Sequence, residues 1–289
     1  MTLKFENYPR KNLVIAAVGD QSLHPYWIPK KQSSYDLFLI NYGKKSYESD
    51  AKYYLEEKGS KFNLINKAIE KYPEILDYNF FWMPDDDIYI ENKDIDRLFN
   101  YMRNYDLWIG QPSIIGWFGL AMTLNNPSCF LRYTNYVEIM CPCFSKFALD
   151  LCKKTFELNK TGYGIDALWN VILSHPTNKL SIIDDVIAMH TREVGGGDMY
   201  KLNTNNNIQE AWAEGRKIYE DYNLGFESFQ DLKKGKLISQ ELFGTMYYNM
   251  IEYGRIHKEM EAGVQKFERL FPNSDILKNI SNKIRNFDL

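Results

Sequence analysis

The chain has 289 residues, of which 45% are hydrophobic and 25% are charged, and its formal net charge is -3. This composition excludes a disordered chain and is ordinary for a soluble globular protein, and the length allows one large core. Lys and Arg are dispersed rather than gathered in a stripe, which argues against a nucleic-acid-binding protein. No apolar run reaches the length of a membrane-spanning helix.

The cysteines and the N-terminus bear on the cellular compartment. The four cysteines match neither the spacing of a zinc site nor the disulfide framework of a small secreted domain: Cys129, Cys141, Cys143 and Cys152. We therefore interpret them as reduced thiols of a cytosolic protein. Residues 1–10 are polar and lack the apolar core of a signal peptide. The expected location is the cytoplasm, with the protein either free or peripheral at the membrane.

The N-terminal half alternates short apolar runs with amphipathic ones. Residues 13–18 and 36–40 are apolar and predict strands. Residues 63–72 and 94–103 carry apolar side chains at helical spacing and predict helices. The polar segment 46–58 is expected to be partly helical. This alternation predicts an α/β layered domain.

A third apolar run ends at three consecutive carboxylates. Residues 78–84 are rich in aromatics, which suits a central strand, and Asp85, Asp86 and Asp87 follow directly. Ligands bind at the carboxyl edge of such sheets, and crowded like charges need a counter-charge, for which Mg²⁺ or Mn²⁺ suits carboxylate oxygens. Because alternate residues point the same way in an extended chain, Asp85 and Asp87 are candidate metal ligands, and Asp86 faces a ribose or a structural donor. The alternative is a solvated acidic turn.

The second half continues the alternation and then changes. It predicts strands at 107–109, 114–124 (with a bend), 137–140 and 180–189, and helices at 145–157, with Ser145 as candidate cap, and at 165–173. From residue 208 onward, after a polar linker at 203–207, apolar residues recur at three- and four-residue steps. We therefore expect a main domain, residues 1–202, and a helical C-terminal appendage, residues 203–289.

Three further features suggest chemistry, and each also has an ordinary explanation. Asp166 opens a predicted helix behind Gly162 and Gly164, so it is either a candidate base or a common first-turn cap. His190 ends a predicted strand and is either a metal ligand or a satisfied core histidine. Residues 195–197 are glycines that form either a hinge beside a site or a plain loop.

The order of these blocks resembles glycosyltransferases of the GT-A fold. More narrowly, residues 137–145, 162–166 and 184–190, followed by the glycine triplet, are similar to the domain of unknown function (DUF) 707 family, which is thought to be glycosyltransferase-like. The resemblance covers about residues 13–197. The chain has Tyr163 where that family usually has Trp, and its acidic triplet differs from the plant form.

The resemblance implies a fold and a site. The fold is a GT-A-like, nucleotide-diphospho-sugar-transferase sheet, mixed but mainly parallel and flanked by helices. Asp85, Asp87 and His190 would bind the metal, and Asp166 would be the base. Residues at the strand ends and the middle aspartate would bind the nucleotide: Val18, Gly19, Asn41, Lys61 and Asp86.

These expectations give one main hypothesis and two alternatives. The main hypothesis is a metal-dependent, inverting glycosyltransferase that binds Mg²⁺ or Mn²⁺ and moves a sugar from a UDP- or GDP-sugar to a hydroxyl of a glycan or another acceptor. A haloacid-dehalogenase-like phosphatase also uses an aspartate pair after a strand, but that pair follows the first strand, so we discount this class. The remaining alternative is a catalytically inactive nucleotide-sugar-binding or scaffold protein.

Overall fold

The computed structural model describes residues 11–117, 120–126, 129–193, 195–197 and 208–224. Its strands are β1 (Asn12–Val18), β2 (Tyr35–Asn41), β3 (Tyr53–Glu56), β4 (Phe80–Trp82), β5 (Ile88–Tyr89), β6 (Ile109–Gly116), β7 (Arg132–Thr134), β8 (Cys143–Ser145) and β9 (Leu180–His190). Its α-helices are α1 (Lys61–Lys71), α2 (Asn92–Asn104), α3 (Lys146–Cys152), α4 (Asp166–Ile172) and α6 (Ile208–Asp221). Short 3-10 helices join several of these elements.

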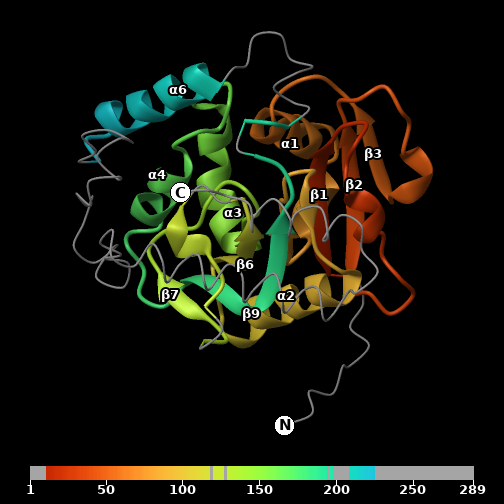
Figure 1. Ribbon diagram of the computed structural model, residues 1–289, viewed down its shortest axis with the longest axis horizontal. Coiled ribbons are helices and arrows are strands. Elements are labelled where there is room, and N and C mark those ends of the chain that lie inside the picture. Colours follow the sequence, from red (N-terminus) through yellow and green to blue (C-terminus); the bar gives the residue numbers. More distant parts are fainter. Residues whose placement is uncertain (1–10, 118–119, 127–128, 194, 198–207, 225–289) are drawn as a thin grey trace, which may run out of the picture.

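The strands form one mixed sheet (Figure 1). Neighbouring strands follow the order β3-β2-β1-β4-β8-β6-β9-β5, and β7 pairs with β9. The longest pairings, β1 with β2 and β6 with β9, are parallel. Because β8 is antiparallel to both β4 and β6, the strands β6 and β9 run in the same direction as β1, β2 and β4. The predicted α/β sheet, mixed and mainly parallel, is confirmed.

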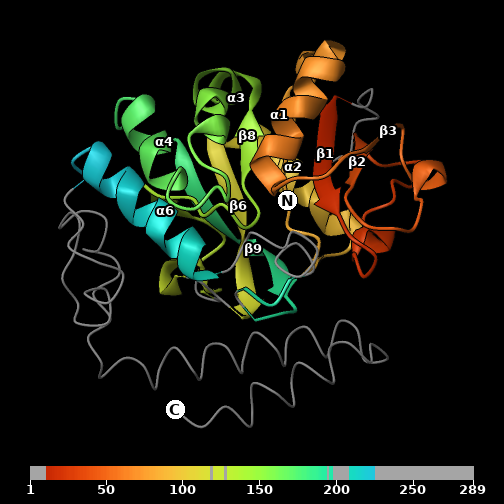
Figure 2. The same ribbon diagram turned by 90° about the horizontal axis from the view of Figure 1, so that it is seen from above.

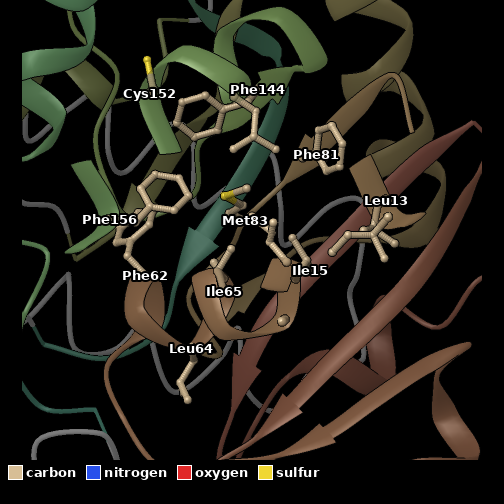
Figure 3. Close-up of a cluster of buried hydrophobic side chains, with 14 of the residues drawn as sticks. Leu13, Ile15, Phe62, Leu64, Ile65, Phe81, Met83, Phe144, Cys152 and Phe156 are labelled. Carbon is tan, nitrogen blue, oxygen red and sulfur yellow. The ribbon is translucent and has the colours of Figure 1, made fainter. Parts of the chain in front are cut away.

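Helices cover both faces of this sheet, because its central strands are apolar on both sides. Leu13 and Ile15 of β1 belong to one buried cluster, which also contains Phe62 of α1 and Phe144 of β8 (Figure 3). Val14 belongs to the other cluster, with residues of α2. The helices α1, α3 and α4 lie over the first face, and α2 lies over the second (Figures 1 and 2). Strands covered on both faces need near-continuous apolar sequence, which is the pattern seen in β1 and β2.

The strand directions bring separate chain segments to one edge of the sheet. Because β1, β2, β4 and β9 run the same way, the residues that follow each of them lie at the same edge. This edge receives Gly19 after β1, Asn41 at the end of β2, the acidic triplet after β4 and His190 at the end of β9. The topology therefore gathers polar residues that are far apart in the sequence.

Three predicted elements differ from the structure. Residues 137–140 form a loop rather than a strand, because the carbonyls of Ile139 and Met140 bond to Lys61 instead of to a neighbouring strand. Segment 46–58 contains the strand β3 as well as a short 3-10 helix, so the helical prediction there was incomplete. The predicted bent strand at 114–124 is a strand only as far as Gly116, where φ is +90°.

The predicted C-terminal appendage lies largely outside the described residues. Its described part, α6, is a helix as predicted and packs against the start of α4. At this contact the Thr161 hydroxyl donates to Glu214 Oε2 at 2.6 Å, and a Cβ placed on Gly164 would lie 3.0 Å from Gly215 Cα. The predicted linker 203–207 and residues 225–289 are outside the described residues. None of the described helices is long and apolar enough to cross a membrane.

Candidate functional site

Asp87 and His190 face each other at the carboxyl edge of the sheet. β5 pairs antiparallel with the end of β9, with Ile88 opposite His190, and the Thr191 amide and hydroxyl donate to the Asp87 carbonyl at 3.1 and 2.8 Å. This pairing sets His190 Nε2 at 3.4 Å from Asp87 Oδ1. The other ring nitrogen, Nδ1, donates to the Trp117 carbonyl at 2.9 Å, so Nε2 is the atom turned toward Asp87.

Burial and charge act against each other in this pair. Burial alone would raise the pKa of Asp87, but the positive charges of His190 and Arg192 outweigh it, so the pKa lies below its ordinary value. Burial would likewise lower the pKa of His190, but the carboxylates of Asp87 and Asp85 raise it to about 9. In the protein without a bound metal, the two side chains form a buried ion pair.

Asp87 and His190 are side chains of the types that bind divalent cations. Among the described residues, the buried Asp87 Oδ1 makes no hydrogen bond, and His190 Nε2 lies 3.4 Å from it. Because Nδ1 bonds to the Trp117 carbonyl, Nε2 is the nitrogen that would bind a metal, once His190 loses its proton. No group of three or more His, Cys, Asp or Glu side chains in the described part of the chain is placed to hold a metal ion. Mg²⁺, however, commonly takes one or two carboxylates and completes its shell with water and substrate phosphates.

Asp85 has a different partner. Lys61 Nζ donates to Asp85 Oδ1 at 2.8 Å and to the carbonyls of Ile139 and Met140 at 2.6 and 2.9 Å. The Lys61 side chain is 8% exposed, whereas that of Asp85 is 40% exposed. Lys61 thus pairs with one oxygen of the first carboxylate of the triplet, and the metal role predicted for Asp85 stays a prediction.

Asp86 contacts one residue in each of the loops that follow β1, β2 and β9. Its Oδ2 accepts from the Gly19 amide at 2.8 Å and from the Tyr42 hydroxyl at 2.6 Å, and Arg192 Nη1 lies 3.5 Å from its Oδ1. Burial and the charge of Asp87 raise the pKa of Asp86 to about 7, although the three partners favour the ionised form. Asp86 therefore contacts structural donors, and its predicted contact with a ribose stays a prediction.

Asp166, the predicted base, is buried at the start of α4. Its Oδ2 accepts from the Tyr136 hydroxyl and from the Ile139 amide, and its Oδ1 accepts from the Ala167 amide at 3.1 Å. Burial raises the pKa of Asp166 to about 6, against the effect of these hydrogen bonds. A helix N-terminus favours the ionised carboxylate, but burial is the largest effect on Asp166. The carboxyl group still ionises below neutral pH.

One loop, residues 136–140, connects the triplet with Asp166. Tyr136 and Ile139 bond to Asp166, while the carbonyls of Ile139 and Met140 bond to Lys61. The Asp85 amide also donates to the Met140 carbonyl at 2.8 Å. The structure therefore brings the predicted metal residues and the predicted base to the two sides of the same loop.

The remaining predicted nucleotide residues lie at the same edge, but their polar groups already have partners. The Gly19 amide bonds to Asp86, and the Val18 carbonyl accepts from the Tyr42 amide at 3.0 Å. The Asn41 side-chain amide donates to the Lys45 carbonyl and to the Tyr54 hydroxyl. Their predicted contacts with a nucleotide stay predictions.

Sequence reasoning missed two charged residues of this site. Arg192 is close to Asp86, and Glu138 lies in the connecting loop with an exposed fraction of 8%. Arg192 could have been suspected from its position two residues after a strand-ending histidine. Glu138 could have been suspected as the one carboxylate within an otherwise apolar run.

Comparison with known proteins gives structural likenesses only. No family model and no curated protein matches the chain, so the resemblance to the DUF707 family gains no support there. Residues 1–349 of *S. aureus* TarS in complex with UDP-GlcNAc align over 95% of this chain and 91% of that chain, with a TM-score of 0.49 and 11% identity. The same TarS residues in complex with UDP align over 96% and 92%, with a TM-score of 0.44 and 10% identity. At these values, the function proposed below rests on this chain's own residues.

Proposed function

We propose that the chain is a glycosyltransferase that moves a sugar from a nucleoside diphosphate sugar to an acceptor hydroxyl. The observation that carries this proposal is that one loop, residues 136–140, contacts Asp166 on one side and Asp85 on the other, and Asp85 belongs to the same triplet as Asp87, the partner of His190. Sugar transfer needs both parts: one to hold the departing diphosphate and one to take the proton of the incoming hydroxyl. The donor class we favour is a UDP- or GDP-sugar.

The donor part consists of Asp87 and His190, with Arg192 beside them. Asp87 and His190 would hold Mg²⁺ or Mn²⁺, which would neutralise charge on the leaving diphosphate. Metal binding would require His190 to lose its proton, so affinity for the metal should rise with pH. Arg192 adds a positive charge beside the acidic triplet, where its Nη1 lies 3.5 Å from Asp86 Oδ1. This Nη1 is buried and makes no hydrogen bond within the described residues.

The acceptor part consists of Asp166 and the groups that hold it. The acceptor oxygen would attack the anomeric carbon, its proton would pass to Asp166, and the bond from the anomeric carbon to the diphosphate oxygen would break. Oδ2 accepts two hydrogen bonds, from Tyr136 and Ile139, whereas Oδ1 accepts one, from the Ala167 amide. Oδ1 is therefore the oxygen with a lone pair left for the proton. A single displacement of this kind inverts the anomeric carbon.

A thermal-shift screen tests the proposal directly. The full chain would be mixed with UDP-glucose, UDP-GlcNAc, UDP-galactose, GDP-mannose and the free diphosphates, each with Mn²⁺ and with EDTA. A stabilising shift with one donor, followed by release of its diphosphate on incubation, supports a transferase. Binding without turnover under any acceptor offered would support the inactive binding protein instead, and no binding at all would reject both.

A further inference from the structure

Glu138 is a buried carboxyl group that the proposed reaction does not use. Only 8% of its surface is exposed, and its Oε2 is buried with no hydrogen-bond partner among the described residues. Buried polar atoms nearly always have a partner, and leaving one unpaired costs free energy. An unpaired carboxyl oxygen at a candidate site therefore points to a ligand that completes it.

The position of Glu138 is fixed by its backbone. Its amide donates to Gln111 Oε1 at 2.7 Å, and Gln111 is a fully buried residue of β6. The next residue, Ile139, donates its amide to Asp166 and accepts from Lys61 at its carbonyl. Glu138 is thus held directly at the connection between the donor part and the acceptor part of the site.

Charged groups on both sides of the loop act on the Glu138 carboxyl group. Burial and the negative charges of Asp166 and Asp85 raise the pKa of Glu138 to about 8, whereas His190 and Lys61 act in the opposite direction. Asp166 belongs to the acceptor part, and the other three belong to the donor part or contact it. At neutral pH the Glu138 carboxyl group is therefore mostly neutral and can both donate and accept a hydrogen bond.

We propose that Glu138 binds a hydroxyl or acetamido group of the sugar being transferred, and so contributes to the choice of donor sugar. This inference rests on the proposed function. In a displacement, the transferred sugar lies between the leaving diphosphate and the base, and Glu138 belongs to the loop that contacts Asp166 on one side and Lys61 and Asp85 on the other. Its Oε2 makes no hydrogen bond with the described residues, so its hydrogen-bonding capacity is left for the sugar.

Two variants of Glu138 separate hydrogen bonding from shape. Glu138→Met keeps a similar volume but cannot hydrogen-bond to the sugar, and Glu138→Gln keeps both the volume and the hydrogen-bonding capacity. Replacing an unpaired buried carboxyl group with an apolar side chain should not prevent folding. Glu74→Ala, at an exposed position in the 3-10 helix Pro73–Asp77, serves as the matched control.

The test is calorimetric titration of UDP, GDP and the sugar nucleotides of the screen, in Mn²⁺ at pH 7. The expected result is that Glu138→Met weakens binding of the preferred sugar nucleotide about tenfold, leaves the free diphosphate unchanged, and is rescued by Glu138→Gln. Equal loss for sugar nucleotide and free diphosphate, or no loss for either, would overturn the role of Glu138 and leave the transferase proposal standing. Failure of the parent protein to bind any of these compounds would overturn both.

Discussion

His190 Nε2 lies 3.4 Å from Asp87 Oδ1 because a strand of only two residues, β5, pairs with the last residues of β9. Ile88 sits opposite His190, and Thr191 binds the Asp87 carbonyl twice. The backbone therefore fixes both side chains before any ligand arrives. Preorganised polar groups of this kind lower the cost of binding a charged ligand, because they need no rearrangement.

The first prediction concerns Asp166→Asn. The amide keeps the shape of the carboxylate but cannot accept the acceptor's proton, so kcat should fall by about 10²–10⁴-fold while donor and metal affinity stay nearly unchanged. Release of the nucleoside diphosphate measures kcat, and titration measures affinity. NMR of the product should show inverted anomeric configuration. Near-normal turnover would remove Asp166 as the base, and a retained configuration would contradict the single displacement.

The second prediction concerns pH. Because burial raises the pKa of Asp166 to about 6, the group is protonated at pH 5 and ionised at pH 7. A base must be ionised to act, so kcat should fall about tenfold per pH unit below pH 6 and level off above it. A pH profile of kcat at saturating donor and metal measures this. The residual activity of Asp166→Asn should not show this fall in kcat below pH 6. If both proteins show it, the fall belongs to another titrating group.

The third prediction concerns the contact between α4 and α6. Gly164 has φ +83°, and an added Cβ would lie 3.0 Å from Gly215 Cα. Gly164→Ala should therefore lower the free energy of unfolding by about 1–3 kcal/mol, through backbone strain and displacement of α6. Urea denaturation measures the change.

The control for this prediction is Gln209→Ala, at an exposed position on α6, which should change the free energy of unfolding by less than about 0.5 kcal/mol. Parent-like stability of Gly164→Ala would show that α6 does not pack there.

Local sequence pattern was sufficient for the framework of the fold. The strands β1 and β2 were predictable because each is a short apolar run, and α1 and α2 because each has apolar residues at helical spacing. Ser145 was predictable as a helix cap from its residue type, and its hydroxyl does accept a hydrogen bond from the Ala148 amide. Each of these features depends on residues that are adjacent in the sequence.

Features that depend on distant partners were not predictable. β5 is too short to have a pattern of its own, and it exists because β9 lies beside it. The apolar run at residues 137–140 looked like a strand, but Lys61 and Asp166 take its backbone hydrogen bonds and hold it as a loop. The triplet suggested a metal as its counter-charge, and the structure shows positive side chains beside it as well. Lys61 pairs with Asp85, Arg192 with Asp86 and His190 with Asp87. These partners are distant in the sequence, so only the folded chain shows them.

We propose that Asp87 and His190 hold the diphosphate of the donor together with a divalent cation. The most direct test of this proposal is calorimetric titration of UDP and GDP into the parent protein, Asp87→Ala and His190→Ala, each in Mn²⁺ and in EDTA. We expect the parent to bind one diphosphate at least about tenfold more tightly in Mn²⁺ than in EDTA, and both variants to lose this difference. Equal affinity of the parent in Mn²⁺ and in EDTA would contradict it.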